Sequence, residues 1–114
     1  MNDRINSILD HMLKDVKEAL QFAEQINSCQ AFSKNPLYRK AIVMSIINIG
    51  ELTKRLPDDF KSENSVIPWR QISGMRDISA HGYHIIDDEI LWDVVKNSIP
   101  ELLKFLQEYF TVSP

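Results

Sequence analysis

Four side chains within a short stretch could together act on a phosphodiester: Arg76, Asp77, His81 and Tyr83. Histidine changes its charge near neutral pH, so His81 could take a proton from a ribose 2′-hydroxyl or give one to the leaving 5′-oxygen. Arginine keeps its charge and offers a planar fork to phosphate oxygens, so Arg76 could bind the scissile phosphate and stabilise the charge that develops on it. We therefore expect chemistry that uses no metal ion and no other cofactor.

The spacing of Arg76 and His81 limits how the two side chains could meet. Five residues of a regular helix turn the chain through about 500°, which leaves the two side chains roughly 140° apart around the helix axis. Both could reach one phosphate if the helix ends near Ala80 and Gly82 lets the chain turn back. Both could also do so if two subunits pool their residues. The sequence leaves these two arrangements open.

Arginine and histidine at this spacing also arise by accident. With 5 arginines and 3 histidines, roughly 0.4 matches are expected by chance in a chain of this size. A purely structural role is therefore the competing interpretation for Arg76 and His81. For Tyr83 the competing interpretation is a half-buried packing tyrosine.

Hydrophobic periodicity places these residues in a chain of helices. Apolar residues recur at every third or fourth position in four stretches, which predicts amphipathic helices. Pro100 interrupts the last stretch without shifting its phase, so this stretch is either one helix kinked at Pro100 or two short helices that meet there. The segment 27–35 shows no clear period, and the segment 57–67 is expected to be a surface loop. The expected helices cover about residues 3–26, 36–56 and 69–80, and the stretch from Asp87-Asp88 to near the C-terminus.

These elements predict an all-α fold, an antiparallel bundle of four to five helices in a single domain over residues 1–114. Glycine and proline are scarce, at 3 and 5 residues, and long stretches lack the alternation typical of strands. A length of 114 residues is common for one domain. The helix over 36–56 is apolar nearly all round, which indicates burial on two sides, by its own bundle and by another subunit.

The overall charge argues against a broad surface that binds nucleic acid. The net charge is −3 and the sequence pI is about 5.5, whereas such surfaces are strongly basic. Any contact with RNA therefore needs positive charge that is local. The single cysteine, the lack of a signal-peptide pattern and the lack of a long apolar stretch predict a cytoplasmic protein.

A metal site is the main alternative interpretation of the histidines. His81, His84, Asp87 and Asp88 could be ligands, because imidazole and carboxylate groups suit several divalent ions. No matching cysteine or histidine lies elsewhere, and Asp87-Asp88 is also a good helix cap. We therefore expect no metal at this position.

Glu51 could support the motif from another helix. It shares one helical stripe with Asn48 and Arg55, because the three residues are three and four positions apart. One interpretation is a solvated or interface salt bridge. The other is that Glu51 faces Arg76 and fixes its guanidinium fork.

The motif resembles the signature of the HepT-like branch of the HEPN superfamily, which is Arg, a polar residue, a few spacers, His, any residue and Tyr. The residues that carry this resemblance are Ile67-Pro68-Trp69-Arg70, then Met75-Arg76-Asp77, then His81-Gly82-Tyr83. The upstream Asn48-Ile49-Gly50-Glu51 with Leu56-Pro57 resembles the same family, as does the segment from Trp92 to Pro100. The likeness covers most of residues 36–110.

The resemblance implies a helical bundle that forms a homodimer, with two Arg…His motifs in one cleft that cuts RNA without a metal. Arg76 and His81 would then be the catalytic pair, and Asp77 would take the place of the polar neighbour, which is often Asn. A carboxylate at this position could orient His81 or Arg76, but it would also repel RNA.

The resemblance also implies a partner. HepT toxins are encoded beside a small nucleotidyltransferase antitoxin of the MNT type, which silences the toxin by adding adenylyl groups to the motif tyrosine. By this resemblance Tyr83 is the acceptor, and added phosphates would block the cleft by charge and bulk. The alternative is a non-catalytic helical dimer that binds a nucleotidyltransferase through its acidic surface and a nucleotide through Arg76. RNA cleavage distinguishes the two hypotheses.

Overall fold

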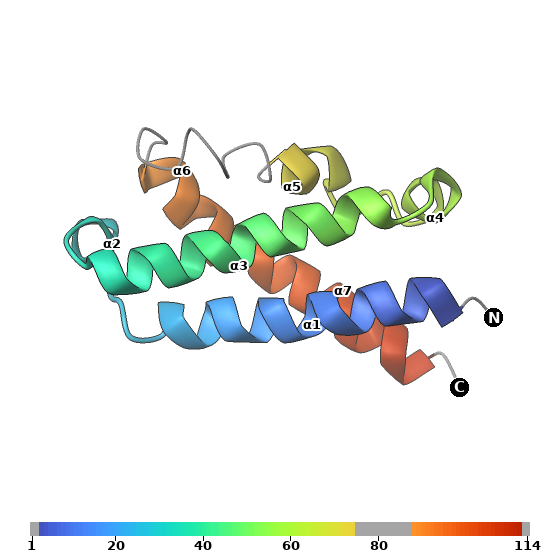
Figure 1. Cartoon of the computed structure of the whole chain (residues 1–114), viewed down its shortest axis with the longest axis horizontal. Helices are drawn as coiled ribbons and strands as arrows, with labels where there is room; N and C mark the ends of the chain where they lie inside the picture. The colour runs from blue at the N-terminus through green and yellow to red at the C-terminus, as the bar shows by residue number, and fades with distance from the viewer. Residues whose placement is uncertain (1–2, 75–87, 113–114) are drawn as a thin grey trace.

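The computed structural model of the chain describes residues 3–74 and 88–112, and every regular element in these two stretches is a helix. α1 (Asp3–Ala23) and α3 (Pro36–Arg55) lie side by side and run in opposite directions, while α7 (Ile99–Val112) crosses behind them and packs against α1 (Figure 1). The predicted all-α fold is confirmed. No described helix is long and apolar enough to cross a membrane.

α3 begins and ends where the sequence predicts. The Asn35 side chain accepts a hydrogen bond from the backbone N–H of Tyr38 at 3.2 Å, and Pro36 occupies the first turn, where its missing N–H costs nothing. The helix ends at Arg55 because Leu56 is extended, as residues before proline usually are. α3 packs against α1 and against α5 (Trp69–Gly74).

Part of the apolar surface of α3 stays uncovered in the single chain. Ile42, Ile46 and Ile49 are buried in the bundle, but Leu37 is 75% exposed and Met44 is 58% exposed. Leu37 and Met44 are seven residues apart and therefore lie on one side of the helix. The predicted burial of one side of α3 within the bundle is confirmed, and the side that carries Leu37 and Met44 is exposed in the single chain.

Two short helices occupy segments in which no helix was predicted. α2 (Cys29–Ser33) is capped by the Ser28 hydroxyl, which accepts a hydrogen bond from the backbone N–H of Ala31 at 3.1 Å. α4 (Asp58–Glu63) follows Pro57 and buries Phe60. The expectation of a surface loop over 57–67 was wrong, and α2 was not predicted, because helices of five and six residues are too short to show a hydrophobic period.

The C-terminal helix is continuous, with a widened turn before Pro100. α6 (Asp88–Asp93) runs into the π-helical turn η2 (Val94–Ser98) and then into α7. The backbone N–H of Ile99 donates to the carbonyl of Val94, five residues back. This shift places Pro100 in the first turn of α7, where a missing N–H is tolerated. Of the two arrangements left open by the sequence, the structure therefore has one helix.

Aromatic rings pack α4 and α5 against α7. Phe60 of α4 packs edge-on against Phe105 and Tyr109 of α7, with ring centroids 6.3 and 6.0 Å apart. Trp69 packs edge-on against Phe105 at 5.7 Å. The Tyr109 hydroxyl lies 2.7 Å from Oδ1 of Asn6, which ties α7 to α1. These rings are thus structural, each covering part of the core.

Candidate functional site

The residues predicted to do chemistry lie outside the described residues: Arg76, Asp77, His81 and Tyr83, together with His84 and Asp87 of the metal alternative. The relation of Arg76 to His81 therefore stays a prediction. The structure does describe the frame on both sides of the motif. The described part of α5 reaches Gly74, two residues before Arg76, and the description resumes in α6 at Asp88, five residues after Tyr83.

α5 is fixed firmly to the bundle. Trp69 is only 7% exposed, and its indole N–H donates to the backbone carbonyl of Asn64 at 3.0 Å. Ile72 on the next turn is also buried, and the helix packs against α3. The chain therefore enters the motif from a helix that cannot shift without opening the core.

α6 is held at its first residue by an ion pair. Nε of Arg39 on α3 donates to Oδ1 of Asp88 at 2.7 Å, and the Ser33 hydroxyl also bonds this carboxylate. Burial raises the pKa of Asp88, but the hydrogen bonds from Ser33 and Arg39 and the positive charge of Arg39 outweigh it, so the pKa lies below its ordinary value. Asp88 thus works as an anchor of its helix to α3.

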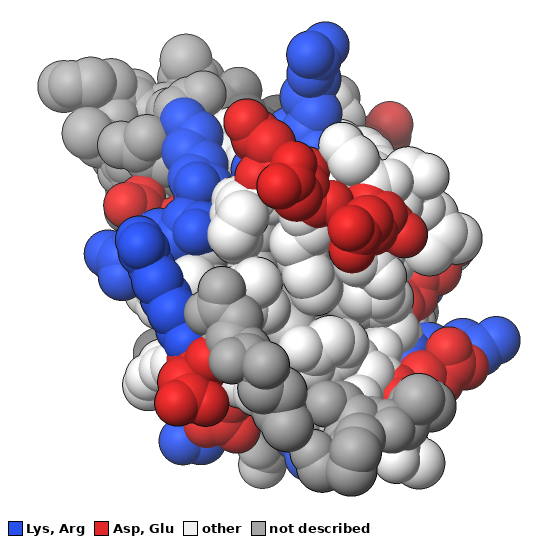
Figure 2. All heavy atoms as spheres, turned by 90° about the vertical axis from the view of Figure 1, so that its right-hand side faces the viewer, with Lys and Arg blue, Asp and Glu red and all other residues white. Residues whose placement is uncertain are grey.

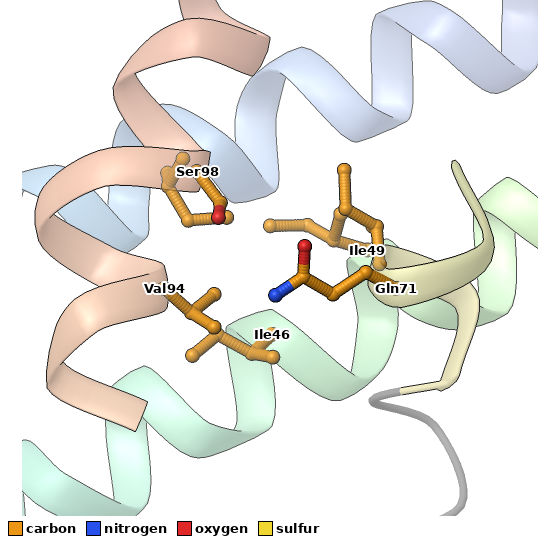
Figure 3. Close-up of a pocket in the computed structure, with 7 residues that line it drawn as sticks. Ile46, Ile49, Gln71, Val94 and Ser98 are labelled. Carbon is orange, nitrogen blue, oxygen red and sulfur yellow. The ribbon is translucent and has the colours of Figure 1, made fainter. Parts of the chain in front are cut away.

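A small apolar pocket lies where α3, α5 and the C-terminal helix meet. Figure 3 shows the Gln71 side chain extending from α5 into the space bounded by Ile46, Ile49 and Val94. Ile72, Ser98 and Ile99 complete the lining. A lining made mostly of aliphatic groups offers little to a phosphate, so we interpret this pocket as part of the packing that fixes α5.

An open groove lined by both charged and apolar residues lies between α4 and α5. Among its lining residues are two cations, Lys61 and Arg70, one carboxylate, Asp58, and two exposed hydroxyls, Ser62 and Ser65. With both cations and the one carboxylate charged, the lining carries +1. This groove was not predicted from the sequence, because α4 lies in a segment expected to be a loop.

A polar hollow lies between α1 and α3. His11 and Asp15 of α1 face Asn48, Glu51 and Arg55 of α3 across it. The predicted stripe of Asn48, Glu51 and Arg55 is therefore confirmed. Counting Asp, Glu, Lys and Arg alone, two carboxylates and one guanidinium give this lining a formal charge of −1. Burial and the neighbouring Glu18 raise the pKa of Asp15, and His11 opposes them.

Charges of both signs share the surface. Figure 2 shows basic side chains along the left-hand edge of this view and acidic side chains across its upper part. A further hollow beside α7 is lined by Glu101, Lys104 and Glu108 with Val66, Ile67 and Phe105, so its lining carries −1. Positive lining is therefore the property that sets the α4–α5 groove apart from these two hollows.

Metal-ligating side chains are not gathered in the part of the chain that the structure describes. No three His, Cys, Asp or Glu side chains among residues 3–74 and 88–112 lie close enough to hold a metal ion. Asp88 of the metal alternative is engaged by Arg39 and Ser33. Its other ligands, His81, His84 and Asp87, lie outside the described residues.

Sequence comparisons place this frame among known proteins. The family model described as ribonuclease HepT-like matches residues 12–109. A protein of Caldanaerobacter subterraneus subsp. tengcongensis, named as a candidate RNase, is 36% identical over 100 residues, which are 88% of this chain and 88% of the relative. A Methanocaldococcus jannaschii protein, also named as a candidate RNase, is 32% identical over 104 residues, 91% of this chain and 85% of the relative.

A third relative carries the HepT name itself. The protein of Thermococcus cleftensis, named as a candidate HepT ribonuclease, is 36% identical over 93 residues, 79% of this chain and 84% of the relative. No solved structure matches the chain. An all-α bundle with this motif and these relatives defines one class of protein, and the chain belongs to the HepT-like ribonuclease family. The resemblance drawn from the motif is thereby confirmed.

Proposed function

We propose that the chain is a metal-independent endoribonuclease and the toxin of a toxin–antitoxin pair, with Arg76 and His81 as its catalytic pair. The observation that carries this proposal is the match to the HepT-like ribonuclease family over residues 12–109, a range that includes the whole motif. The anchored ends of α5 and α6 support it, since a cleavage site needs rigid elements on either side.

Cleavage by this pair needs only groups that the chain and the RNA supply. His81 removes the proton of a ribose 2′-hydroxyl, whose oxygen attacks the adjacent phosphorus and displaces the 5′-oxygen. A protonated His81, from the second subunit, returns a proton to that leaving oxygen. Arg76 binds the non-bridging oxygens and stabilises their added charge, and Asp77 orients the neighbouring arginine or histidine. The products are a 2′,3′-cyclic phosphate and a 5′-hydroxyl.

A homodimer brings two motifs into one cleft in this proposal. The exposed apolar residues on α3, Leu37 and Met44, support a subunit contact because large exposed apolar side chains on one face often mark an interface. Ile90 of α6 is likewise half exposed. Light scattering of the wild type and of Met44→Lys tests this contact, and a wild-type monomer at micromolar concentration would contradict it.

Glu51 is a positioning residue for Arg76 in this proposal. Its half-buried carboxylate lies on α3 and lines the α1–α3 hollow. A carboxylate near a guanidinium fixes the direction of its planar fork.

Tyr83 is the regulatory site in this proposal. In the cytoplasm a cognate MNT-type nucleotidyltransferase transfers the adenylyl group of ATP to the phenol oxygen, with release of pyrophosphate and the phenol proton. Further adenylyl groups extend the first, and the added phosphates repel RNA from the cleft. Intact mass of the chain after incubation with ATP and the nucleotidyltransferase, beside Tyr83→Phe, tests this step. Adenylylation that persists in Tyr83→Phe would assign the modification to another residue.

The decisive experiment is cleavage of mixed cellular RNA by the purified chain in EDTA. Intact mass first establishes that the chain is unmodified, and His81→Ala and Arg76→Ala are assayed beside it. We expect the wild type alone to cut. Equal cutting by both variants would remove Arg76 and His81 from the mechanism.

A binding module is the second candidate, and the acidic net charge of −3 favours it. In this alternative the chain is a non-catalytic dimer that binds the nucleotidyltransferase or a nucleotide. Failure of the unmodified dimer to cut any RNA would select this alternative.

A further inference from the structure

We propose that the groove between α4 and α5 binds the phosphodiester backbone of single-stranded RNA next to the cleavage site. The choice of RNA rests on the proposed ribonuclease function. A chain with a net charge of −3 needs local positive charge to hold a polyanion. The α4–α5 groove supplies it with a lining of +1, whereas the α1–α3 hollow and the hollow beside α7 each carry −1.

Both cations of the groove are available to a ligand. The Lys61 side chain is 22% exposed, so its aliphatic stem is already packed and little conformational freedom is lost when the ammonium binds. Its partner Asp58 lies 3.8 Å away and is fully exposed, which makes this a weak surface pair. Arg70 is exposed on α5 and forms no ion pair with any described residue.

The remaining groove lining fits a phosphate backbone better than bases. Ser62 and Ser65 are exposed and carry hydroxyls that can donate to phosphate oxygens. Trp69 contributes to the lining, but it is buried and its indole N–H is engaged by Asn64, so its ring face is not free to stack on a base. The groove therefore holds RNA without selecting its sequence.

Chain connectivity keeps this groove near the proposed catalytic pair. Arg70 and Gly74 belong to one helix, and four helical residues span about 6 Å. The two further residues to Arg76 add at most about 7 Å. The Cα atoms of Arg70 and Arg76 are therefore at most about 13 Å apart, so one strand of RNA can contact both residues.

The test measures binding apart from cleavage. A fluorescent, fully 2′-O-methylated RNA oligonucleotide has no 2′-hydroxyl to attack, so its affinity can be measured by anisotropy in the wild type at several salt concentrations. The variant Lys61→Met, Arg70→Gln removes both charges and keeps the lysine stem. Arg55→Gln is the control for the loss of a single positive charge away from the groove, because it removes one exposed arginine from the acidic α1–α3 hollow.

We expect the double variant to bind roughly 25-fold more weakly at 0.1 M salt, with the slope of log affinity against log salt reduced by about 1.4, because each phosphate contact contributes about 0.7. Arg55→Gln should stay within about two-fold of the wild type. Equal losses in the two variants, an unchanged double variant, or a wild type that does not bind RNA would each overturn the proposal. A wild type that binds RNA through this groove but fails to cut unmethylated RNA would instead reject only the nuclease function.

Discussion

The α4–α5 groove and the α1–α3 hollow are both lined in part by charged residues, and they differ in the sign of their charge. The groove places Lys61 and Arg70 against one carboxylate, and that carboxylate is fully exposed. The hollow places Arg55 against two carboxylates, Asp15 and Glu51. An acidic protein can therefore present a positive binding surface where acids are few, and net charge alone does not decide whether it binds RNA.

Charge reversal in the groove is the change expected to have the largest effect on RNA binding. In Lys61→Glu, Arg70→Glu the lining changes from +1 to −3, because two positive charges become negative beside Asp58. We expect RNA affinity to fall by more than about 25-fold, since repulsion adds to the two lost contacts. Anisotropy with the methylated oligonucleotide measures this, and an unchanged melting temperature shows that the fold is intact. Retained affinity would move the binding surface elsewhere.

Glu51 belongs to the acidic α1–α3 hollow and is also proposed to position Arg76, so its substitution should affect cleavage and not RNA binding. In Glu51→Gln we expect the cleavage rate at saturating RNA to fall about ten-fold, roughly 1.4 kcal/mol, because a misplaced Arg76 fork stabilises the transition state less well. RNA affinity should not fall. Glu51→Asp keeps the carboxylate and should recover part of the rate. A Glu51→Gln protein with wild-type rate and stability would leave Glu51 as a surface residue only.

A substitution in the Arg39–Asp88 ion pair tests whether the stability of the fold can change without a change in RNA binding by the groove. The side chains are 14% and 27% exposed, and we expect Asp88→Asn to lower the free energy of unfolding by about 1 kcal/mol at pH 7. Because folding lowers the pKa of Asp88, this contribution is complete above its ordinary value of 3.8 and is lost as the pH falls through the folded value.

Urea unfolding of the wild type and Asp88→Asn at pH 7 and pH 3 measures this difference. The exposed Asp59→Asn on α4 serves as the control. We expect RNA affinity at pH 7 to stay unchanged in Asp88→Asn. A difference in stability that is as large at pH 3 as at pH 7 would show that the ion pair is not its source.

The sequence predicted those parts of the fold that rest on long periodic patterns or local caps. The helix over 36–56 was predicted to within one residue because Asn35-Pro36 and Leu56-Pro57 define its ends by local chemistry. The first helix was predicted to reach Ile26 but ends at Ala23, since Ile26 continues the apolar pattern and is buried just beyond the helix. Hydrophobic periodicity indicates which residues are buried, and buried residues can continue beyond the end of a helix.

Features made by long-range contacts could not be predicted in the same way. The partner of Asp88 is Arg39, which lies 49 positions away, and the sequence suggested a helix cap or a metal ligand for this aspartate. The α4–α5 groove depends on α4, whose six residues show no period, and on how α5 packs beside it. The motif Arg76, Asp77, His81 and Tyr83 came from residue types and resemblance, and its geometry stays a prediction.

Asp15→Asn is expected to have the smallest effect. It tests whether RNA binding depends on the charge of the whole surface or on the position of the groove cations. Burial and Glu18 raise the pKa of Asp15 above its ordinary value of 3.8, so the ionised carboxylate destabilises the fold at neutral pH, and this cost disappears as the pH falls below 3.8. We expect Asp15→Asn to raise the free energy of unfolding at pH 7 by less than about 0.5 kcal/mol, and the gain to vanish at pH 3.

The substitution also brings the lining of the hollow from −1 to 0. RNA affinity should nevertheless change by less than about two-fold, because Arg55 is the single Lys or Arg in the lining of the hollow. A larger gain in affinity would mean that the charge of the whole surface, rather than the position of Lys61 and Arg70, governs RNA binding.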